Sequence, residues 1–323
     1  MKDRILIPQE ISRIGIEFLE KNGYVVDFGC GAGEKEIIRS LNGCNGLLIR
    51  NARVTKAIID AAPHLRVIAR HGVGVDTIDV DYATKKNVWV TNAPESNFNA
   101  VAEHTMMMML VLAKNLIEVH KTFSDGDFNV RHRIVNMELP NKTLGIVGFG
   151  RVGKEVARKA FFGLGMKVLV FDPYYTDTGN FNHVQKCRTL VELFSQSDFI
   201  SLHLPVTADT RGLINSDLLG CMKRTAYLIN AARHEIINEE DFISAMVSRQ
   251  FAGAAIDVFE SDPPDNNSPM LHLPNVVYTP HNAAHTVEAF TNMAMHAAQG
   301  IHEVLSGNRP TWPVNNIIGN SFS

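Results

Sequence analysis

Several apolar runs in this chain end in side chains that could transfer a proton or hold an anion. They are His203, Arg233, Asp257, Glu260, Asp262 and His281. Imidazole titrates near neutral pH, so a histidine could give a proton to a carbonyl oxygen or take it back. A carboxylate beside it would orient the ring, and an arginine would bind a substrate carboxylate and polarise the carbonyl. Each residue alone also fits a structural role, but together they predict interconversion of a carbonyl and an alcohol.

Residues 142–173 contain a glycine motif that predicts a dinucleotide site. Its members are Gly148, Gly150, Arg151, Val152 and Gly153. Gly148 permits a tight turn, Gly150 lets the backbone approach a pyrophosphate, and Gly153 lets helix and strand pack closely. A glycine-rich turn without a ligand is the alternative. The apolar run before the motif, the helical pattern after it and the second apolar run at 168–171 favour nucleotide binding.

Asp172 ends that second apolar run, where a carboxylate could accept hydrogen bonds from the adenosine ribose. The residues that follow, 173–176, include no Arg or Lys to hold a 2′-phosphate, which favours NAD as the cofactor. Asp also commonly begins a turn before Pro, so a purely local role for Asp172 remains open.

The order of elements predicts an α/β protein built on parallel sheets. Short apolar strands alternate with helical patterns before residue 100 and again after residue 142. The expected strands are 4–7, 24–28, 46–49, 65–69, 88–91, 144–147, 168–171, 199–204, 226–230, 253–258 and 276–279. The length of 323 residues suggests about two domains. Ligands of such sheets bind at the carboxyl ends of the strands, where the reactive side chains should gather.

The strand ends of the first half carry Arg50, Arg70 and the sequence Gly72-Val73-Gly74. Backbone N–H groups of this glycine segment could hold an anion, with the arginines adding charge. A tight turn with surface arginines explains the pattern equally well.

A long helical pattern at 100–120 is apolar nearly all round, so we expect it to be buried between domains or against another subunit. Its four consecutive methionines, 106–109, fit core packing better than an adaptable binding surface. Glu103 and His104 are expected to be structural or to bridge domains. The stretch 123–140 is polar and aperiodic, which predicts a loop.

Composition places the chain among ordinary globular proteins, with 45% hydrophobic and 20% charged residues. A net charge of −3 gives no electrostatic reason to expect a nucleic acid or a membrane as partner. The four cysteines lack C-x-x-C spacing, so we expect reduced thiols and no metal site. The start of the chain does not resemble a signal peptide, and we expect a cytoplasmic protein.

The chain resembles the D-isomer-specific 2-hydroxyacid dehydrogenases over nearly its whole length. The matching stretches are ARHGVGVDTID (69–79), VTNAPESN with VAEHT (90–105), TLGIVGFGRVG (143–153), SLHLPVTADTRGLIN (201–215), LINAAR (228–233), GAAIDVFESDPP (253–264) and TPHNAAHT (279–286). The resemblance implies a flavodoxin-like substrate lobe, residues 1–99 with 288–323, and a Rossmann NAD-binding lobe, residues 100–287. It also implies a cleft between the lobes and a homodimer formed through the buried helix.

The same resemblance implies roles for single residues. Arg233 would bind and polarise a 2-keto acid, and His281 would be its general acid in reduction and base in oxidation. The third catalytic residue would be Asp262. The implied lining of the NAD site is Pro205, Thr210, Ala231 and Asp257. The implied substrate residues are Arg50, Arg70, Val73 and Gly74.

Four positions depart from the family pattern. The family usually has Glu where this chain has Asp262, and the shorter side chain must approach His281 more closely or act through water. Glu260 is a second available carboxylate. His234 replaces a usual Gly, Glu95 stands where Gly is common, and Asn282 replaces a usual apolar residue. The proton donor and the arginine are retained, so we expect activity.

The leading hypothesis is an NAD-dependent reductase of small 2-keto acids. Arg50 and Arg70 are compatible with a second anionic group on the substrate. The chain resembles phosphoglycerate-type dehydrogenases at both positions, which makes phosphohydroxypyruvate a leading candidate, with hydroxypyruvate or glyoxylate next. A non-catalytic NAD-sensing interaction protein of the same fold is the alternative from another class. A dehydrogenase of bulky sugar acids is a third possibility, and Glu95, Phe128 and Tyr174 do not decide it.

Overall fold

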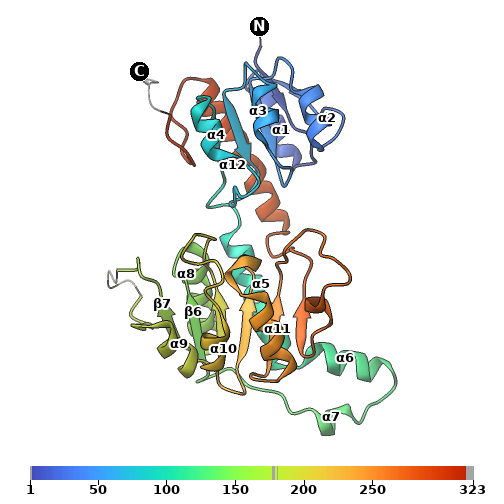
Figure 1. Ribbon diagram of the computed structural model, residues 1–323, viewed down its shortest axis with the longest axis vertical. Coiled ribbons are helices and arrows are strands. Elements are labelled where there is room, and N and C mark those ends of the chain that lie inside the picture. Colours follow the sequence, from blue (N-terminus) through green and yellow to red (C-terminus); the bar gives the residue numbers. More distant parts are fainter. Residues whose placement is uncertain (1, 177–178, 180, 318–323) are drawn as a thin grey trace. The chain divides into compact units, whose positions relative to one another are not determined.

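The computed structural model describes residues 2–176, 179 and 181–317 (Figure 1). The chain divides into two compact units, each of which has its own sheet and its own core. The first unit comprises the described residues of Met1–Asn97 and His285–Ser323, and the second is Phe98–Ala284.

The first unit is a five-stranded parallel sheet with helices on both faces. Its strands are β1 (Arg4–Leu6), β2 (Val25–Asp27), β3 (Gly46–Ile49), β4 (Val67–Arg70) and β5 (Trp89–Thr91), in the order β2-β1-β3-β4-β5. Its helices are α1 (Arg13–Lys21), α2 (Glu34–Ser40), α3 (Lys56–Asp60), α4 (Val80–Lys85) and α12 (Val287–Leu305). This strand order is that of flavodoxin-like folds, as the resemblance implied.

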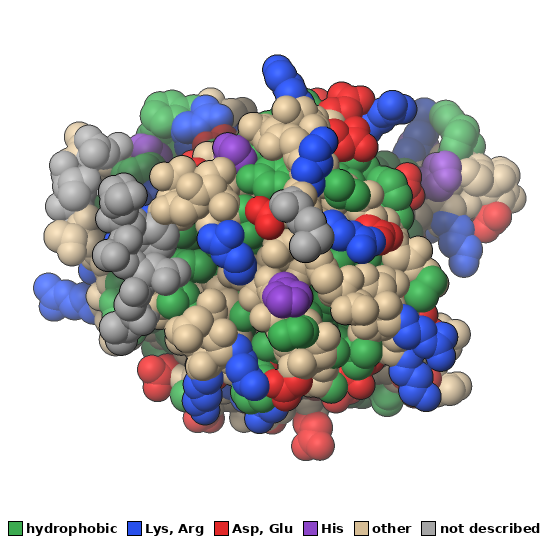
Figure 2. Space-filling model, turned by 90° about the horizontal axis from the view of Figure 1, so that it is seen from above, with side chains coloured by type: hydrophobic (Ala, Val, Ile, Leu, Met, Phe, Trp, Pro, Cys, Tyr) green, Lys and Arg blue, Asp and Glu red, His purple; other side chains and the backbone are tan. Residues whose placement is uncertain are grey.

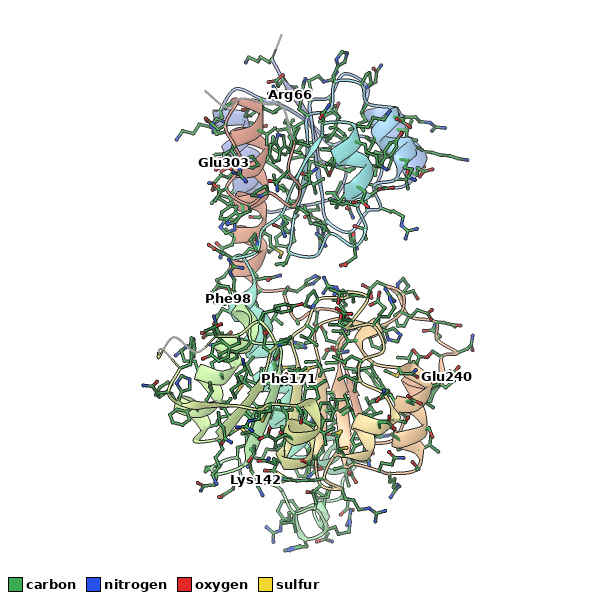
Figure 3. All side chains as sticks on the ribbon, turned by 60° about the vertical axis from the view of Figure 1, so that its left-hand side comes forward. Arg66, Phe98, Lys142, Phe171, Glu240 and Glu303 are labelled. Carbon is green, nitrogen blue, oxygen red and sulfur yellow. The ribbon has the colours of Figure 1, made fainter. Side chains whose placement is uncertain are left out.

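Alternating residues of the strands are buried on the two opposite faces of this sheet. Leu6 and Ile68 pack with α2, α3 and α4, whereas Ile5 and Val67 pack with α1 and α12. Successive side chains of a strand point to opposite faces, so both faces are apolar and the strands read as continuous apolar runs. Arg66, labelled in Figure 3, donates to the carbonyls of Val304 and Leu305 and so caps the end of α12.

The second unit is a seven-stranded parallel sheet in the order β12-β11-β10-β9-β6-β7-β8. Its strands are β6 (Thr143–Val147), β7 (Lys167–Phe171), β8 (Val184–Lys186), β9 (Phe199–Leu202), β10 (Tyr227–Asn230), β11 (Gly253–Ile256) and β12 (Val276–Tyr278). Its α-helices are α5 (Phe98–Ala113), α6 (Leu116–Ser124), α7 (Val130–Arg133), α8 (Arg151–Arg158), α9 (Leu190–Gln196), α10 (Ser216–Gly220) and α11 (Glu239–Val247). It also has the π-helical segment η1 (Lys159–Gly163) and the 3-10 helices η2 (His234–Ile236) and η3 (Pro269–His272). The order contains the Rossmann arrangement, whose switch point lies between β6 and β9.

Two apolar layers enclose this second sheet. Helices α5 and α8 cover one face and α9, α10 and α11 cover the other. Met108 and Met109 of α5 are fully buried against strand residues, which fits core packing. The expected long helix at 100–120 is interrupted at Asn115, whose φ of 47° is left-handed and ends the helical path between α5 and α6.

Charged side chains of both signs are interspersed on the face shown in Figure 2, in keeping with the net charge of −3. In the part of the chain that the structure describes, no single helix is long and apolar enough to cross a membrane. The pair α5 and α6, bent by 59°, meets that test only when taken together. Cys44 and Cys187 are buried, and Cys30 is exposed.

Candidate active site

The turn after β6 has the backbone geometry that a bound pyrophosphate requires. Gly148 has a φ of +93°, and a Cβ there would lie 2.5 Å from the His203 carbonyl oxygen. A Cβ on Gly153 would lie 2.3 Å from the Gly148 carbonyl oxygen, so helix and turn pack as closely as glycine allows. A Cβ on Gly150 would meet nothing within 4 Å, so the space beside it is open to a ligand.

Helix α8 begins at this turn, next to that open space. Its N-cap is Gly150, which supplies no side-chain hydrogen bond, and the bond from Lys154 N to Gly150 O begins the helical ladder. Backbone N–H groups of the first turn, from Arg151, Val152 and Gly153, face the N-terminal end, where a helix favours negative charge. The open cradle and the positive helix end both fit the pyrophosphate of NAD.

Asp172 follows Phe171, the last residue of β7, which Figure 3 labels. Its Oδ2 accepts the Phe149 N–H at 2.7 Å, and its Oδ1 accepts the Tyr174 N–H at 2.8 Å. Asp172 therefore begins a local turn and also ties the end of β7 to the glycine turn. Each carboxylate oxygen keeps a second lone pair for a ribose hydroxyl, so the local and the ligand roles are compatible.

The other residues expected to line the NAD site follow β9 and β10. Thr210 Oγ1 donates to the Pro205 carbonyl at 2.7 Å, which folds this loop back on itself. Ala231 follows Asn230, a buried residue whose Oδ1 accepts the Ala232 N–H at 3.0 Å. Both segments lie at the same sheet edge as the glycine turn.

The two histidines at this edge have different surroundings. The His203 ring lies 2.9 Å from Ser201 Oγ, and burial lowers its pKa to about 4. His203 is therefore neutral at neutral pH and cannot serve there as the proton donor. His281 has an exposed side chain that can reach a substrate.

His281 is paired directly with Asp262. The distance from His281 Nδ1 to Asp262 Oδ2 is 2.5 Å, and both side chains are 47% exposed. An ionised carboxylate only accepts hydrogen bonds, so Nδ1 carries the proton of this bond, which leaves Nε2 as the ring nitrogen for proton exchange. The shorter Asp side chain thus reaches the ring without a water, and the carboxylate that holds His281 is that of Asp262 and not of Glu260.

Arg233 lies in the turn after β10. The Asn230 side chain shapes this turn, because its Nδ2 donates to the Arg233 carbonyl at 2.9 Å. The Arg233 guanidinium donates to the Ala232 carbonyl at 2.7 Å. The next residue, His234, turns away to Glu239 at the start of α11, with Nε2 and Oε2 3.1 Å apart. The unusual His234 therefore has a local contact with a carboxylate.

Asp257 is fully buried, and its carboxylate is bonded within the protein. It accepts the Thr279 hydroxyl at 2.6 Å and the backbone N–H groups of Asn282 and Ala283 at 3.0 and 3.1 Å. Sequence reasoning named Asp257 as a carboxylate at a strand end and in the lining of the NAD site, but it missed this network. The spacing of Asp257 and His281 along the chain does not indicate these hydrogen bonds.

The first unit brings its two expected arginines to neighbouring strands. Arg50 follows β3 and lies 5.0 Å from the Phe290 ring centroid, and Arg70 ends β4 and donates to the Gly74 carbonyl at 3.0 Å. Burial and then the charges of Arg50 and Arg70 lower the pKa of His71 to about 4. The positive charges of both arginines therefore act on the His71 ring at this edge of the sheet. Val73, beside them, is 38% exposed.

No group of three or more His, Cys, Asp or Glu among the described residues is arranged to hold a metal ion. Fold and site together define a two-unit α/β protein with a Rossmann nucleotide-binding domain. The family model of the "D-isomer specific 2-hydroxyacid dehydrogenase, NAD binding domain" matches residues 106–283. The chain belongs to the D-isomer-specific 2-hydroxyacid dehydrogenase family, and it carries that family's NAD-binding domain.

Named relatives and solved structures agree. A D-3-phosphoglycerate dehydrogenase of Synechocystis is 39% identical over 308 residues, which cover 94% of this chain and 54% of the relative. A glyoxylate reductase of Thermofilum pendens is 35% identical over 286 residues, 87% of this chain and 84% of the relative. A crystal structure of a Thermus thermophilus protein superposes with a TM-score of 0.87 at 29% identity, covering 97% of this chain and all of that one. The chain thus spans little more than half the length of the phosphoglycerate dehydrogenase.

Proposed function

We propose that the protein is an NAD-dependent oxidoreductase that interconverts a small 2-keto acid and its D-2-hydroxy acid. The observation that carries this proposal is the direct His281–Asp262 pair at the sheet edge that also holds Arg233 and the glycine turn. Bound at that edge, the nicotinamide supplies the hydride for reduction and accepts it in oxidation.

The chain's own residues account for the rest of the chemistry. Arg233 holds the substrate carboxylate and stabilises negative charge on the carbonyl oxygen. His281 gives a proton from Nε2 to that oxygen in reduction and takes it back in oxidation. Asp262 holds the ring through Nδ1 and stabilises the positive charge that the ring carries before proton transfer. Asp172 accepts hydrogen bonds from the adenosine ribose, and Gly150 admits the pyrophosphate.

The first unit, in this proposal, binds the substrate, and backbone N–H groups near Val73 and Gly74 meet its carboxylate. Arg50 and Arg70 come from adjacent strands, and both depress the pKa of His71. Two cations at the ends of adjacent strands suit a phosphate better than a neutral group. Phosphohydroxypyruvate is therefore the preferred substrate, with hydroxypyruvate and glyoxylate next. The names of the two relatives support the same short list.

A homodimer is also part of the proposal. Helix α6 has no buried residue, and Leu116, Ile117 and Phe123 on it are 51%, 58% and 56% exposed. Phe128 beyond it is 57% exposed. Apolar side chains this exposed on one segment are typical of a surface covered by another subunit. Size-exclusion chromatography with light scattering tests this, and a monomer at micromolar concentration would contradict it.

The substrate class is tested by NADH oxidation against phosphohydroxypyruvate, hydroxypyruvate, glyoxylate, pyruvate and 2-ketogluconate, with NADPH for comparison. We expect turnover with NADH and the highest kcat/KM for phosphohydroxypyruvate. A preference for 2-ketogluconate would overturn the substrate assignment and favour a sugar-acid dehydrogenase. Tight NADH binding without turnover of any keto acid would favour an NAD-sensing protein.

A further inference from the structure

His104 lies on α5, yet its ring contacts the segment that carries His281. Its Nε2 is 3.0 Å from Thr279 Oγ1 and 3.5 Å from Asp257 Oδ1. The side chain is only 11% exposed. A polar ring in this position, 175 residues from Thr279 in sequence, joins a helix on one face of the sheet to the loop after β12.

The hydrogen-bond directions in this cluster follow from chemistry. The Asp257 carboxylate only accepts, so the Thr279 hydroxyl at 2.6 Å must use its one hydrogen on Asp257. Thr279 Oγ1 then has only lone pairs left, so His104 must donate to it from Nε2. Desolvation lowers the pKa of His104, against the opposing effect of the Asp257 charge, in keeping with a neutral ring protonated on Nε2.

The cluster fixes the backbone on both sides of His281. Thr279 lies two residues before it, and Asn282 and Ala283, which donate to Asp257, follow it directly. His281 itself has a φ of +50°. This left-handed conformation is unfavourable for a non-glycine residue, so the surroundings must hold it in place.

We propose that His104 is a positioning residue for the proton donor: it orients the Thr279 hydroxyl onto Asp257, and Asp257 holds the backbone that presents His281. The inference rests on the proposed function, because it gives His104 a role only through His281. This positioning role differs from core packing, because it depends on one N–H donor and not on the volume of the ring.

Three variants distinguish the effect of the His104 N–H donor from the effect of its side-chain volume. His104→Leu keeps an apolar side chain of similar size and removes the donor, whereas His104→Gln keeps an N–H at a similar reach. Thr279→Val removes the hydroxyl with little change of shape. His64→Leu, at an exposed histidine in the turn between α3 and β4, is the control.

We expect His104→Leu to lower kcat about 10- to 100-fold, as a small misplacement of a reacting group does, with the KM for NADH within about twofold. His104→Gln should recover most of the activity, and His64→Leu should match the wild type. The double variant His104→Leu/Thr279→Val should be no slower than the worse single variant, because both remove the same link. Multiplicative losses in the double variant, or no recovery by Gln, would overturn the proposal.

A second readout does not depend on turnover. Hydrogen exchange of the Asn282 and Ala283 amides should be faster in His104→Leu than in the wild type and unchanged in His64→Leu. Unchanged exchange in His104→Leu would overturn the positioning role. Absence of turnover by the wild type would instead overturn the proposed function, and the exchange rates would still decide what His104 holds.

Discussion

Replacing Asp262 by Asn tests the pair that defines the site. The substitution keeps the size of the side chain and removes its charge. In the wild type the carboxylate can only accept, so Nδ1 of His281 carries a proton and Nε2 is free to exchange with a substrate. An amide can also donate to Nδ1, which stabilises the opposite tautomer and weakens the hold on a protonated ring.

The expected loss follows from the geometry. A hydrogen bond to a charged group contributes about 1.5–3 kcal/mol. Both side chains are 47% exposed, so solvent screening moves the value toward the lower end, about 1–2 kcal/mol. Because about 1.4 kcal/mol corresponds to a tenfold change in rate, kcat should fall roughly 5- to 30-fold.

The assay is steady-state NADH oxidation with the preferred keto acid, with kcat and KM measured separately. Asp262→Glu should keep most of the activity, because the family usually has Glu at this position. Glu260→Gln removes the neighbouring exposed carboxylate and serves as the control, with kcat expected within about twofold of the wild type. A larger loss from Glu260→Gln than from Asp262→Asn would refute the reasoning.

Three further predictions concern cofactor, substrate and acid stability. Asp172→Ser should raise the Kd for NADH about tenfold by fluorescence titration, because it removes a ribose acceptor, and an unchanged Kd would contradict that role. Arg50→Ala should raise the KM for phosphohydroxypyruvate about tenfold while that for glyoxylate stays within about twofold, and equal changes would argue against a phosphate at Arg50. Burial depresses the pKa of His203 to about 4, so between pH 6.5 and 4 the unfolded chain binds a proton on this ring that the folded protein does not. The contribution of the neutral ring to the free energy of unfolding is therefore fully present above pH 6.5 and is lost as the pH falls from 6.5 to 4. This amounts to at most about 3 kcal/mol, and urea unfolding of His203→Gln should show a shallower decline over that pH range than the wild type.

Much of the fold could be predicted because buried parallel strands appear in the sequence as short, continuous apolar runs. Runs such as Ile5–Ile7 and Val168–Phe171 are apolar on both faces, and their alternation with helices indicates a parallel sheet. Local breaks were harder to predict. The helix at 100–120 ends early because Asn115 adopts a left-handed conformation that apolar periodicity does not encode. The edge strand β8 was missed because Val184–Lys186 is short and mostly exposed.

The site could be predicted in its residue types but not in its contacts. Spacing left Glu260 and Asp262 as alternative partners of His281, and only the backbone path places the Asp262 carboxylate on Nδ1. Asp257 was expected to line the NAD site, which stays a prediction, but the complete burial of its side chain in a hydrogen-bond network could not be predicted. His104 was expected to be structural or to bridge domains, but its partner Thr279 could not be predicted, because the fold and not the local sequence brings the two together.

The most direct test of the central claim follows the hydride itself. Phosphohydroxypyruvate, hydroxypyruvate and glyoxylate are each incubated with NADH deuterated at C4 of the nicotinamide, and the products are analysed by NMR and on a chiral column. We expect one deuterium at C2 of the 2-hydroxy acid and, for the first two substrates, the D configuration. A product of L configuration, or NADH that binds but transfers no deuterium to any of the three, would contradict the account.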